Sequence, residues 1–513
     1  MKENTLKSAI APRRGIWEHI YSSVYYGCSK RLAASNASGE AEASMPRPIL
    51  GFHTTIDGLK KVVPSQVEDV LASDSSMAEE VRERVGKGEM PEEIWTREDL
   101  LTGMLISMSR GKAFQRMIRS KKVFDWTMQT LGYDQLRTGG TSGNMATILA
   151  PLGFPEILLY VNPLTREQAE LLPRDDNLRV ILRDVGLESE CGYTLNRPVE
   201  AWREEGIRAV HWIFEYPEGM KVCAGGVDVT TPRANRFIAA YNPVNNQLVL
   251  DDDFKAGLLA LVRQRVSRGE RGRRFTHFII SGFHILSESY PDGSGCRDCL
   301  EPVSQFVSEV KMADSGLKLH YELASIGSRA VRHSLMELII PLVHSLGLNE
   351  VELVTLLRDI GEASLAAEVE TKESPESIFN GLVATAERLG LARIHLHNLG
   401  YYLCVSRPEF ASARESRNGL VFAACAAAAR TQSGSIKSFD DVGRGLGVGI
   451  SDLGLEAGRK LGKYIGCPEL WETGIACVNG WEVSYVPTKV VERPAITVGL
   501  GDLISSSAFL MGT

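Results

Sequence analysis

The sequence lacks any uninterrupted apolar run long enough to cross a bilayer. Its longest apolar runs, GLVFAACAAAA (419–429) and LMELIIPLVHSLGL (335–348), are too short or too interrupted for that. The N-terminus also lacks the apolar core of a signal peptide. We therefore expect a cytoplasmic protein that does not insert into a membrane.

A disulfide framework and a strong positive charge are also missing. The nine cysteines are scattered and odd in number, and CRDC (296–299) is a single CxxC motif without a second pair nearby, so zinc is the less favoured interpretation. The net charge of −7 gives no general attraction for nucleic acid. The basic run RQRVSRGERGRR (263–274) is interpreted as a solvated loop rather than as a nucleic-acid patch.

What the sequence has instead is an alternation of strand and helix patterns from about residue 130 onward. Strand-like runs such as EILLYV, HFIISG and KLHYELAS alternate with helix-like runs. This order predicts an α/β fold with a large, doubly wound and mostly parallel sheet. Between about 196 and 245 the runs are strand-like with few helix signals, which predicts a smaller β-rich lid domain.

The expected domain division has three parts, two of them discontinuous along the chain. AASNASGEAEASMPRP (33–48) reads as a linker, and ILGFHTTID (49–57) reads as a first strand. The predicted parts are an N-terminal helical segment with its linker (1–48), a large α/β nucleotide-binding domain (49–57, 130–195 and 246–513), and a lid or substrate domain (58–129 and 196–245).

Three polar sites fall where strands are expected to end. They are Asp57, the segment RTGGTSGNMA (137–146), and the segment ITVGLGD with Gly499, Gly501 and Asp502. In open parallel sheets ligands bind outside the carboxyl ends of the strands, so these sites are candidates for one binding cleft. For the second site, a plain strand-to-helix turn is an equally good interpretation.

The GxGD segment predicts a strand, a glycine turn and then a helix with a carboxylate at its first turn. A helix N-terminus preceded by glycines binds anions. The Asp502 carboxylate beside it could accept a proton. An anion site next to a base is what phosphoryl transfer to a hydroxyl requires.

A metal site is the next expectation. In KLHYELAS the alternation places His320 and Glu322 on one face of a strand. In SLGLNEVELVTLL, Asn349 begins a helix and Glu352 follows three residues later. This spacing is that of a capping box. It is equally compatible with a carboxylate near Mg²⁺, which often uses only one or two carboxylates. Both interpretations stay open.

Taken together these segments resemble one family. GGTSGNMA, HWIFEYPEG followed by PRANRFI, SGFH, HYELAS, SLGLNEVEL, RIHLHNLGYYL and VPTKVV with TVGLGD occur in the order found in the ADP-dependent sugar kinases. These are the ADP-specific glucokinases and phosphofructokinases of archaea, with an animal glucokinase relative. The similarity covers roughly residues 49–513. It implies a ribokinase-like fold and Mg²⁺-dependent transfer of the β-phosphoryl group of ADP to a sugar hydroxyl, which leaves AMP.

The resemblance also implies roles for individual residues. It implies that Asp502 is the catalytic base, with Gly499 and Gly501 in the same motif, and that the metal-associated acids are Glu322 and Glu352, with Glu350 as the alternative to Glu352. Nucleotide contacts are implied for Arg233, with Arg236 as the alternative, and for His397 and Val490. A solvated charge on the lid remains an equally good interpretation of the two arginines, and a packed structural histidine of His397.

The sugar side departs from the family pattern. Asp57 and the glycines Gly140 and Gly143 are retained, and His211 completes the expected sugar-binding residues. Where relatives carry asparagine, glutamate and glutamine, this chain has Thr55, Gln115 and Thr141. Each replacement shortens or neutralises a group that would hold a sugar hydroxyl, and such changes alter the choice of substrate.

A phosphorylated acceptor such as fructose 6-phosphate is therefore modestly favoured over glucose. Arg166 and Arg179 are candidates for its countercharge, although exposed surface charges are the more common role of such residues. The expected partners are ADP and a sugar or sugar phosphate. The alternatives are an ATP-using kinase of the same fold and a non-catalytic protein that binds ADP or AMP.

Overall fold

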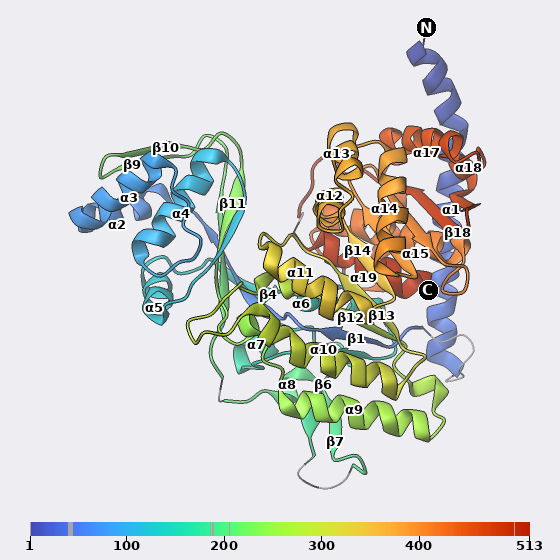
Figure 1. Cartoon of the computed structure of the whole chain (residues 1–513), viewed down its shortest axis with the longest axis horizontal. Coiled ribbons are helices and arrows are strands. Elements are labelled where there is room, and N and C mark those ends of the chain that lie inside the picture. The colour runs from blue at the N-terminus through green and yellow to red at the C-terminus, as the bar shows by residue number, and fades with distance from the viewer. Residues whose placement is uncertain (1, 39–44, 185, 187–188, 205, 497) are drawn as a thin grey trace.

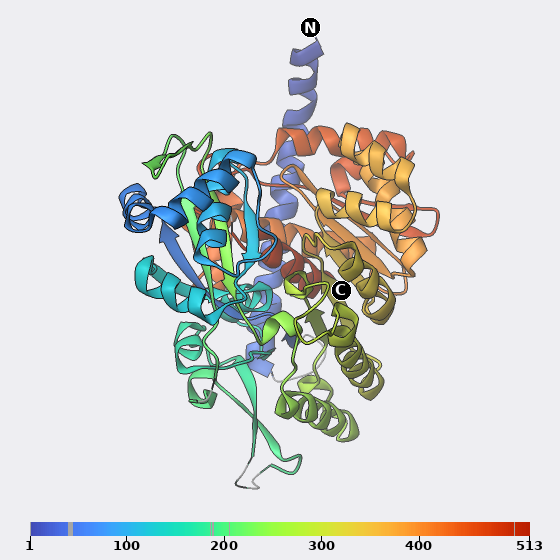
Figure 2. The same cartoon turned by 60° about the vertical axis from the view of Figure 1, so that its left-hand side comes forward.

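The computed structural model describes residues 2–38, 45–184, 186, 189–204, 206–496 and 498–513. Its strands form an eleven-stranded sheet in a large α/β domain, a five-stranded sheet in a smaller domain that projects to one side, and a separate β-hairpin (Figure 1). Figure 2 shows the same two domains from a second direction. None of the described helices is both long and apolar enough to cross a membrane.

Parallel strands form the centre of the large sheet. Parallel pairing runs without a break from β6 to β15, and antiparallel strands complete both edges, which confirms the predicted mostly parallel sheet. In spatial order the strands are β17 (Ile475–Val478), β18 (Trp481–Pro487), β16 (Tyr401–Ser406), β15 (Arg393–His397), β14 (Ser345–Leu348), β13 (Lys318–Glu322), β12 (His277–Ile280), β1 (Pro48–Gly51), β5 (Ile157–Leu159), β6 (Leu178–Arg183) and β7 (Tyr193–Asn196).

Helices cover both faces of this sheet. Neighbouring helices of one layer pack against each other in the series α9 (Asp252–Ser267), α10 (Cys296–Ala313), α11 (Arg329–Leu338), α12 (Glu350–Asp359) and α14 (Pro375–Leu389). The opposite layer contains α6 (Thr141–Leu149), α19 (Leu500–Gly512), α15 (Ala413–Ser433) and α1 (Lys2–Ser38). The remaining helices of this domain are α7 (Arg166–Leu171), α8 (Pro198–Ala201), α13 (Ala363–Lys372), α16 (Phe439–Val442), α17 (Asp452–Tyr464) and α18 (Leu470–Thr473).

Helix α19 is buried because small residues let α15 approach it closely. The Ala-rich run 419–429 lies within α15, and Gly419 faces the end of α19. A Cβ at Gly419 would stand 2.4 Å from the Ala508 carbonyl oxygen. The alanine run therefore forms a helix contact inside the domain.

The smaller domain is built on the strands β3 (Phe114–Met117), β11 (Asn235–Tyr241), β8 (Val210–Tyr216), β2 (Thr55–Lys61) and β4 (Gln135–Gly139), in that order. One face packs against α2 (Pro64–Ser73), α3 (Ser75–Lys87), α4 (Arg97–Arg110) and α5 (Lys121–Thr130), and the hairpin of β9 (Lys221–Ala224) and β10 (Val227–Thr230) joins this core. This domain is the predicted lid.

The predicted domain boundaries need correction. ILGFHTTID is not one strand, because β1 ends at Gly51 and β2 begins at Thr55 in the lid sheet. Asp57 therefore belongs to the lid, and so does β4, which was expected in the large domain. At the other boundary β7 pairs with β6, so the inserted β-rich segment begins at Val210 rather than at residue 196.

The N-terminal segment is a docked helix of the large domain. Trp17, Tyr21, Val24 and Cys28 are buried along one face of α1, at helical spacing. The Trp17 indole donates to the Trp471 carbonyl at 2.9 Å. The expected linker continues through residues 39–44, which lie outside the described residues.

Replacing Trp17 by alanine should destabilise the protein by about 3–5 kcal/mol, because the change empties a fully buried site. Tyr26→Ala on the same helix, at a side chain that is 60% exposed, should change stability by less than about 0.5 kcal/mol. Chemical denaturation measures both. Equal stability of the two variants would show that α1 does not dock as described.

Candidate active site

The GxGD segment begins helix α19. Gly499 is the N-cap in the left-handed region at φ 71°, and Asp502 lies in the first turn. Arg430 from α15 donates to the Gly499 carbonyl at 3.1 Å. The expected strand before the turn is not formed by Ile496 or Val498, and Thr497 lies outside the described residues. The first amide groups of a helix have no partner within it, so the start of α19 is suited to bind an anion.

Asp502 is a partly buried carboxylate that accepts a side-chain hydrogen bond. Asn144 of α6 donates to Asp502 Oδ2 at 2.9 Å. Burial raises the pKa of Asp502 to about 7, against the opposing effects of the Asn144 hydrogen bond and the Arg430 charge, while the Asp57 carboxylate raises it further. A carboxylate with a pKa near neutrality is suited to accept and release a proton.

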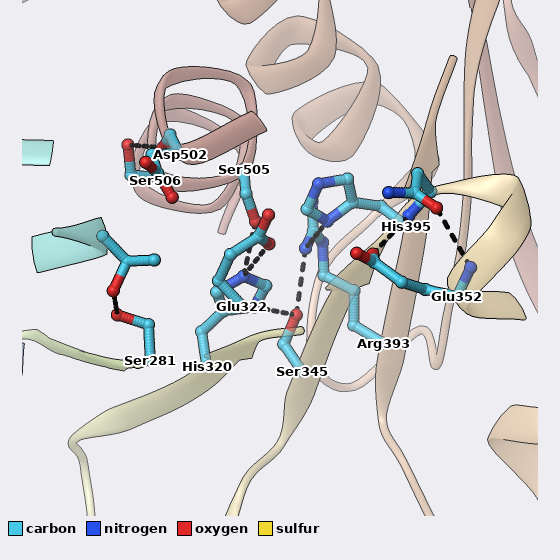
Figure 3. Close-up of polar contacts among 12 residues, drawn as sticks. Ser281, His320, Glu322, Ser345, Glu352, Arg393, His395, Asp502, Ser505 and Ser506 are labelled. Atoms are coloured by element: carbon cyan, nitrogen blue, oxygen red, sulfur yellow. Dashed lines mark hydrogen bonds and ion pairs between the residues drawn. The ribbon is translucent and has the colours of Figure 1, made fainter. Parts of the chain in front are cut away.

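Glu322 lies at the carboxyl end of β13, next to the first turns of α19 (Figure 3). Burial raises its pKa well above the ordinary value, and hydrogen bonding from Ser505 opposes this effect. His320 Nε2 stands 3.8 Å from Glu322 Oε2 and 2.8 Å from the Ser505 hydroxyl. This carboxylate is thus held between the sheet and α19.

Gly347 of β14 makes the meeting of Glu322 and Ser505 sterically feasible. Glu322, Gly347 and His395 are cross-strand neighbours on β13, β14 and β15. A Cβ at position 347 would stand 2.2 Å from Ser505 Oγ and 2.3 Å from Glu322 Oε2. Any residue larger than glycine would therefore push α19 away from the sheet or displace the carboxylate.

Glu352 forms the capping box that its spacing predicts. Asn349 accepts from the Glu352 amide at 3.0 Å, and Glu352 Oε2 accepts from the Asn349 amide at 3.0 Å. Ser325 donates to Glu352 Oε1 at 3.2 Å. Burial raises the pKa of Glu352 to about 7. The capping interpretation is confirmed, and a role near Mg²⁺ stays a prediction. Glu350, the alternative, lines a groove of about 650 Å³ beside the β15–β16 turn.

The sugar-binding candidates lie mainly on the lid. Arg137 of β4 donates to Asp57 at 3.3 Å, and burial raises the pKa of Asp57 to about 6, although Arg137 and Arg236 oppose this. Asp57 and His211 are cross-strand neighbours, so they share the face of the lid sheet opposite its core. The electrostatic effect of Asp57 on Asp502 places the lid carboxylate near the proposed base.

Thr55 and the turn after β4 lie beside these carboxylates. The Thr55 side chain is buried, and its hydroxyl has no partner within the described residues. Thr141 Oγ1 and Ser281 Oγ form a hydrogen bond of 2.6 Å. Gly140 caps α6, with Gly143 in its first turn, and α6 also carries Asn144.

Two of the other predicted residues, Gln115 and Arg233, do not lie beside Asp57 and Asp502. Gln115 shares the face of Ile238 on the lid sheet, but its strand lies three strands from that of Asp57, about 14 Å at the usual spacing. Arg233 is exposed and donates to the Gly111 carbonyl at 2.6 Å. The alternative, Arg236, is the one that faces Asp57.

The two predicted adenine contacts lie on different segments. His397 lies close to Gly501, because a Cβ at position 501 would stand 3.3 Å from His397 Nε2. Burial lowers the pKa of His397 to about 4. Val490 is 41% exposed in the loop after β18, where its amide donates to Gly449. Both stay predictions.

The sequence interpretation gave no individual role to four polar residues of the site: Asn144 and Arg137, which lie within the candidate segment 137–146, and Arg430 and Arg393, which it did not single out. Asn144 stands inside the quoted GGTSGNMA motif, and Arg430 is the residue that ends the Ala-rich run. Arg393 is fully buried on β15 beside His395. An arginine at the end of a buried helix, or inside a central strand, is the signal that would have found two of them.

The two domains, the large and mostly parallel sheet and the carboxylate at the start of α19 are the features expected of a phosphotransferase. Residues 46–511 match the model of the ADP-specific phosphofructokinase/glucokinase conserved region. The chain thus belongs to this family of ADP-dependent sugar kinases.

Relatives of both kinds are similar to the chain. It is 29% identical to the ADP-specific phosphofructokinase of Methanosarcina acetivorans, over 96% of each chain. It is 31% identical to the ADP-dependent glucose/glucosamine kinase of Pyrococcus abyssi, over 96% of this chain and 98% of that one.

Solved structures agree. The last common ancestor of ADP-dependent phosphofructokinases from Methanosarcinales superposes with a TM-score of 0.80 at 30% identity, over 96% of this chain and 97% of that chain. An ADP-dependent kinase in complex with fructose-6-phosphate and ADPβS gives 0.77 at 28% identity, with the same coverage.

The raised pKa of Asp502 predicts the pH dependence of catalysis. A base must be ionised, so kcat/KM should rise with a slope near one up to about pH 7 and then level. Burial raises the pKa of Glu352 to about 7 as well, so the apparent pKa of the acidic limb of this pH profile belongs to the two groups together. Asn144→Leu removes the hydrogen bond that favours ionised Asp502, so it should move the limb to higher pH. A limb near pH 4, the ordinary aspartate value of about 4, or one that N144L leaves unmoved, contradicts the assignment.

Proposed function

We propose that the protein transfers the β-phosphoryl group of ADP to a hydroxyl of a phosphorylated sugar, with fructose 6-phosphate favoured over glucose, and releases AMP. The observation that carries this proposal is Asp502, a partly buried carboxylate at the amide end of α19 whose pKa desolvation raises to about 7. It combines a base and an anion site within one helical turn. The solved relative in complex with fructose-6-phosphate and ADPβS supports the substrate pair.

The residues divide the work as follows. Asn144 orients the Asp502 carboxylate, which accepts the proton of the acceptor hydroxyl as that oxygen attacks the β-phosphorus. The first amides of α19 and the Arg430 guanidinium, which is anchored on Gly499, stabilise the negative charge of the transferring phosphoryl group. Asp57 on the lid holds the sugar opposite the base.

The carboxylate cluster fits Mg²⁺. Glu322, Glu352 and Asp502 lie close enough for Glu352 and Asp502 to raise the pKa of Glu322. Its Oε2 is buried without a well-aligned hydrogen bond from the described residues. No group of three or more His, Cys, Asp or Glu in the described chain could enclose a metal alone. Glu322 and Glu352 would hold the ion together with water and phosphate oxygens, and the ion would neutralise phosphate charge.

The acceptor is proposed from the charges of the cleft. Arg137 and Arg236 lower the pKa of Asp57, and Arg430 lowers the pKa of Asp502, so three guanidinium groups act on the two carboxylates. Arg suits phosphate geometry. Arg166, the countercharge expected from the sequence, instead pairs with Glu170 on the surface and is 70% exposed. The cleft arginines therefore replace it in the proposal.

An acceptor panel tests this function. With Mg²⁺ and ADP, fructose 6-phosphate should give AMP and a bisphosphorylated sugar in equal amounts by ³¹P NMR, with a kcat/KM at least about tenfold above that for glucose. Gln115→Glu should lower this ratio, since a new carboxylate on the lid face repels the phosphate. Gln135→Glu, at an exposed position on the opposite edge strand, is the matched control.

The competing functions give different outcomes in the same panel. Turnover with ATP in place of ADP would identify an ATP-using kinase, and nucleotide binding without turnover of any acceptor would identify a binding protein. Glucose turnover above that of fructose 6-phosphate would overturn the proposed acceptor. The retention of Asp502, Glu322 and Glu352 together favours the catalytic alternative.

A further inference from the structure

A row of buried polar residues crosses the centre of the large sheet beneath α19. His320 of β13, Ser345 of β14 and Arg393 of β15 are cross-strand neighbours, and all three are fully buried. Arg393 Nη1 lies 3.0 Å from Ser345 Oγ, and Ser345 Oγ lies 2.9 Å from His320 Nδ1. Figure 3 shows this row next to Glu322 and Ser505.

Arg393 is the unusual member of this row. Its side chain is fully buried, yet it has no carboxylate partner among the described residues. Its Nη1 contacts Ser345 and His395 Nδ1 at 3.1 Å, and the guanidinium lies 5.8 Å from the Phe509 ring and near the Cys404 thiol. Its Nε and Nη2 have no hydrogen-bond partner among the described residues. A buried arginine without a counter-ion is costly to desolvate. Packing does not explain its presence, so a role in the site is the better explanation.

The chemistry of the groups gives the hydrogen bonds a direction. Arginine only donates, so Ser345 Oγ accepts from Arg393 and is left with its own proton to donate to His320 Nδ1. His320 then carries its proton on Nε2 and donates to Ser505 Oγ at 2.8 Å. Ser505, having accepted, keeps its own proton for the Glu322 carboxylate, which lies beside it where Gly347 leaves room for both side chains. The hydroxyl and imidazole protons of Ser345, His320 and Ser505 then each have an acceptor.

The reverse direction leaves groups unsatisfied. If His320 carried its proton on Nδ1, Ser345 would accept from both neighbours. Its own buried hydroxyl proton would then have no acceptor among the described residues. Ser505 would donate to His320 Nε2, and the Glu322 carboxylate would lose its donor. An unsatisfied buried donor and a carboxylate without its donor both raise the free energy of the folded state.

We propose that Arg393 is a positioning residue for Glu322. Through Ser345, His320 and Ser505 it orients a one-way chain of hydrogen bonds that ends on the Glu322 carboxylate. The chain fixes the Nε2–H tautomer of His320 and holds the carboxylate in place for a divalent cation. Groups that hold metal ligands in this way commonly change metal affinity 10- to 100-fold. The metal part of the inference rests on the proposed function.

Two readouts test the chain, and only one requires the metal. Imidazole ¹⁵N NMR reports the tautomer of His320, which is one of ten histidines and is assigned with the H320Q variant. Electron paramagnetic resonance gives the dissociation constant of Mn²⁺ with ADP present and acceptor absent. Wild-type His320 should carry its proton on Nε2. Ser345→Ala and Arg393→Met should each raise the Mn²⁺ dissociation constant at least about tenfold.

Ser406→Ala is the matched control. Ser406 is an equally buried serine on β16, directly across from Arg393, and its hydroxyl is bonded only to backbone carbonyls. S345A and S406A each remove one buried hydroxyl, so similar melting temperatures are expected. Only S345A should weaken Mn²⁺ binding. Arg393→Lys keeps the charge and one donor, so its dissociation constant should fall between those of wild type and R393M.

Two results overturn the inference: a wild-type His320 protonated on Nδ1, or Mn²⁺ binding by S345A and R393M as tight as by S406A. If the wild-type protein binds no Mn²⁺, the metal role in the proposed function is wrong. The tautomer of His320 in wild type and in R393M then still decides whether Arg393 directs the chain.

Discussion

The close approach of helix α19 to the carboxyl ends of β13 and β14 is the constraint on which the active site depends. Gly347 leaves the space in which Ser505 and Glu322 meet. From the other side, the small residues of α15 let its helix press α19 against the sheet, with Gly419 facing the Ala508 carbonyl. Sheet, α19 and α15 are thus packed with little free space, and the first turn of α19 has a fixed position over the strand ends. A base, an anion site and a carboxylate for the metal follow from that one placement.

The second consequence of this packing is electrical. It buries Glu322 and Glu352 and partly buries Asp502. Desolvation raises the pKa of each carboxyl group, and the charges of Glu352 and Asp502 raise that of Glu322 further. Arginine side chains neutralise only part of this negative charge. Arg430 acts on Asp502, and Arg137 and Arg236 act on Asp57. A site with an excess of buried negative charge is suited to bind a divalent cation. The same excess raises the pKa of a carboxylate toward the value that a general base needs.

Much of this could be predicted from the sequence, because the signals were local. The mostly parallel sheet follows from alternating strand and helix patterns, and the capping box of Asn349 and Glu352 from spacing alone. Partners distant in the sequence were not predictable. Asn144 and Asp502 are separated by 358 positions, and the hydrogen bond between them exists only in the fold. The crossing from β1 to β2 was missed because ILGFHTTID continues a strand pattern across the change of sheet.

The buried row could have been found from a pattern that was applied to KLHYELAS but not to RIHLH. In KLHYE and RIHLH polar and apolar residues alternate within strands at the centre of a parallel sheet. Central parallel strands are normally apolar on both faces. Polar residues at every second position therefore mark a face where the sheet meets something polar. Here that face meets α19, where Ser505, Ser506 and Ser507 are fully buried.

The most direct test of this account is the Asp502→Asn variant, because the substitution keeps the size and removes the ability to take a proton. The account predicts that turnover of fructose 6-phosphate with ADP falls by about 10²–10⁴-fold. The dissociation constant for ADP, measured by calorimetry, should stay unchanged, since the amides of α19 remain in place. Turnover near that of the unmodified protein would contradict the account, because it would leave Asp502 as no more than a residue in the first turn of α19.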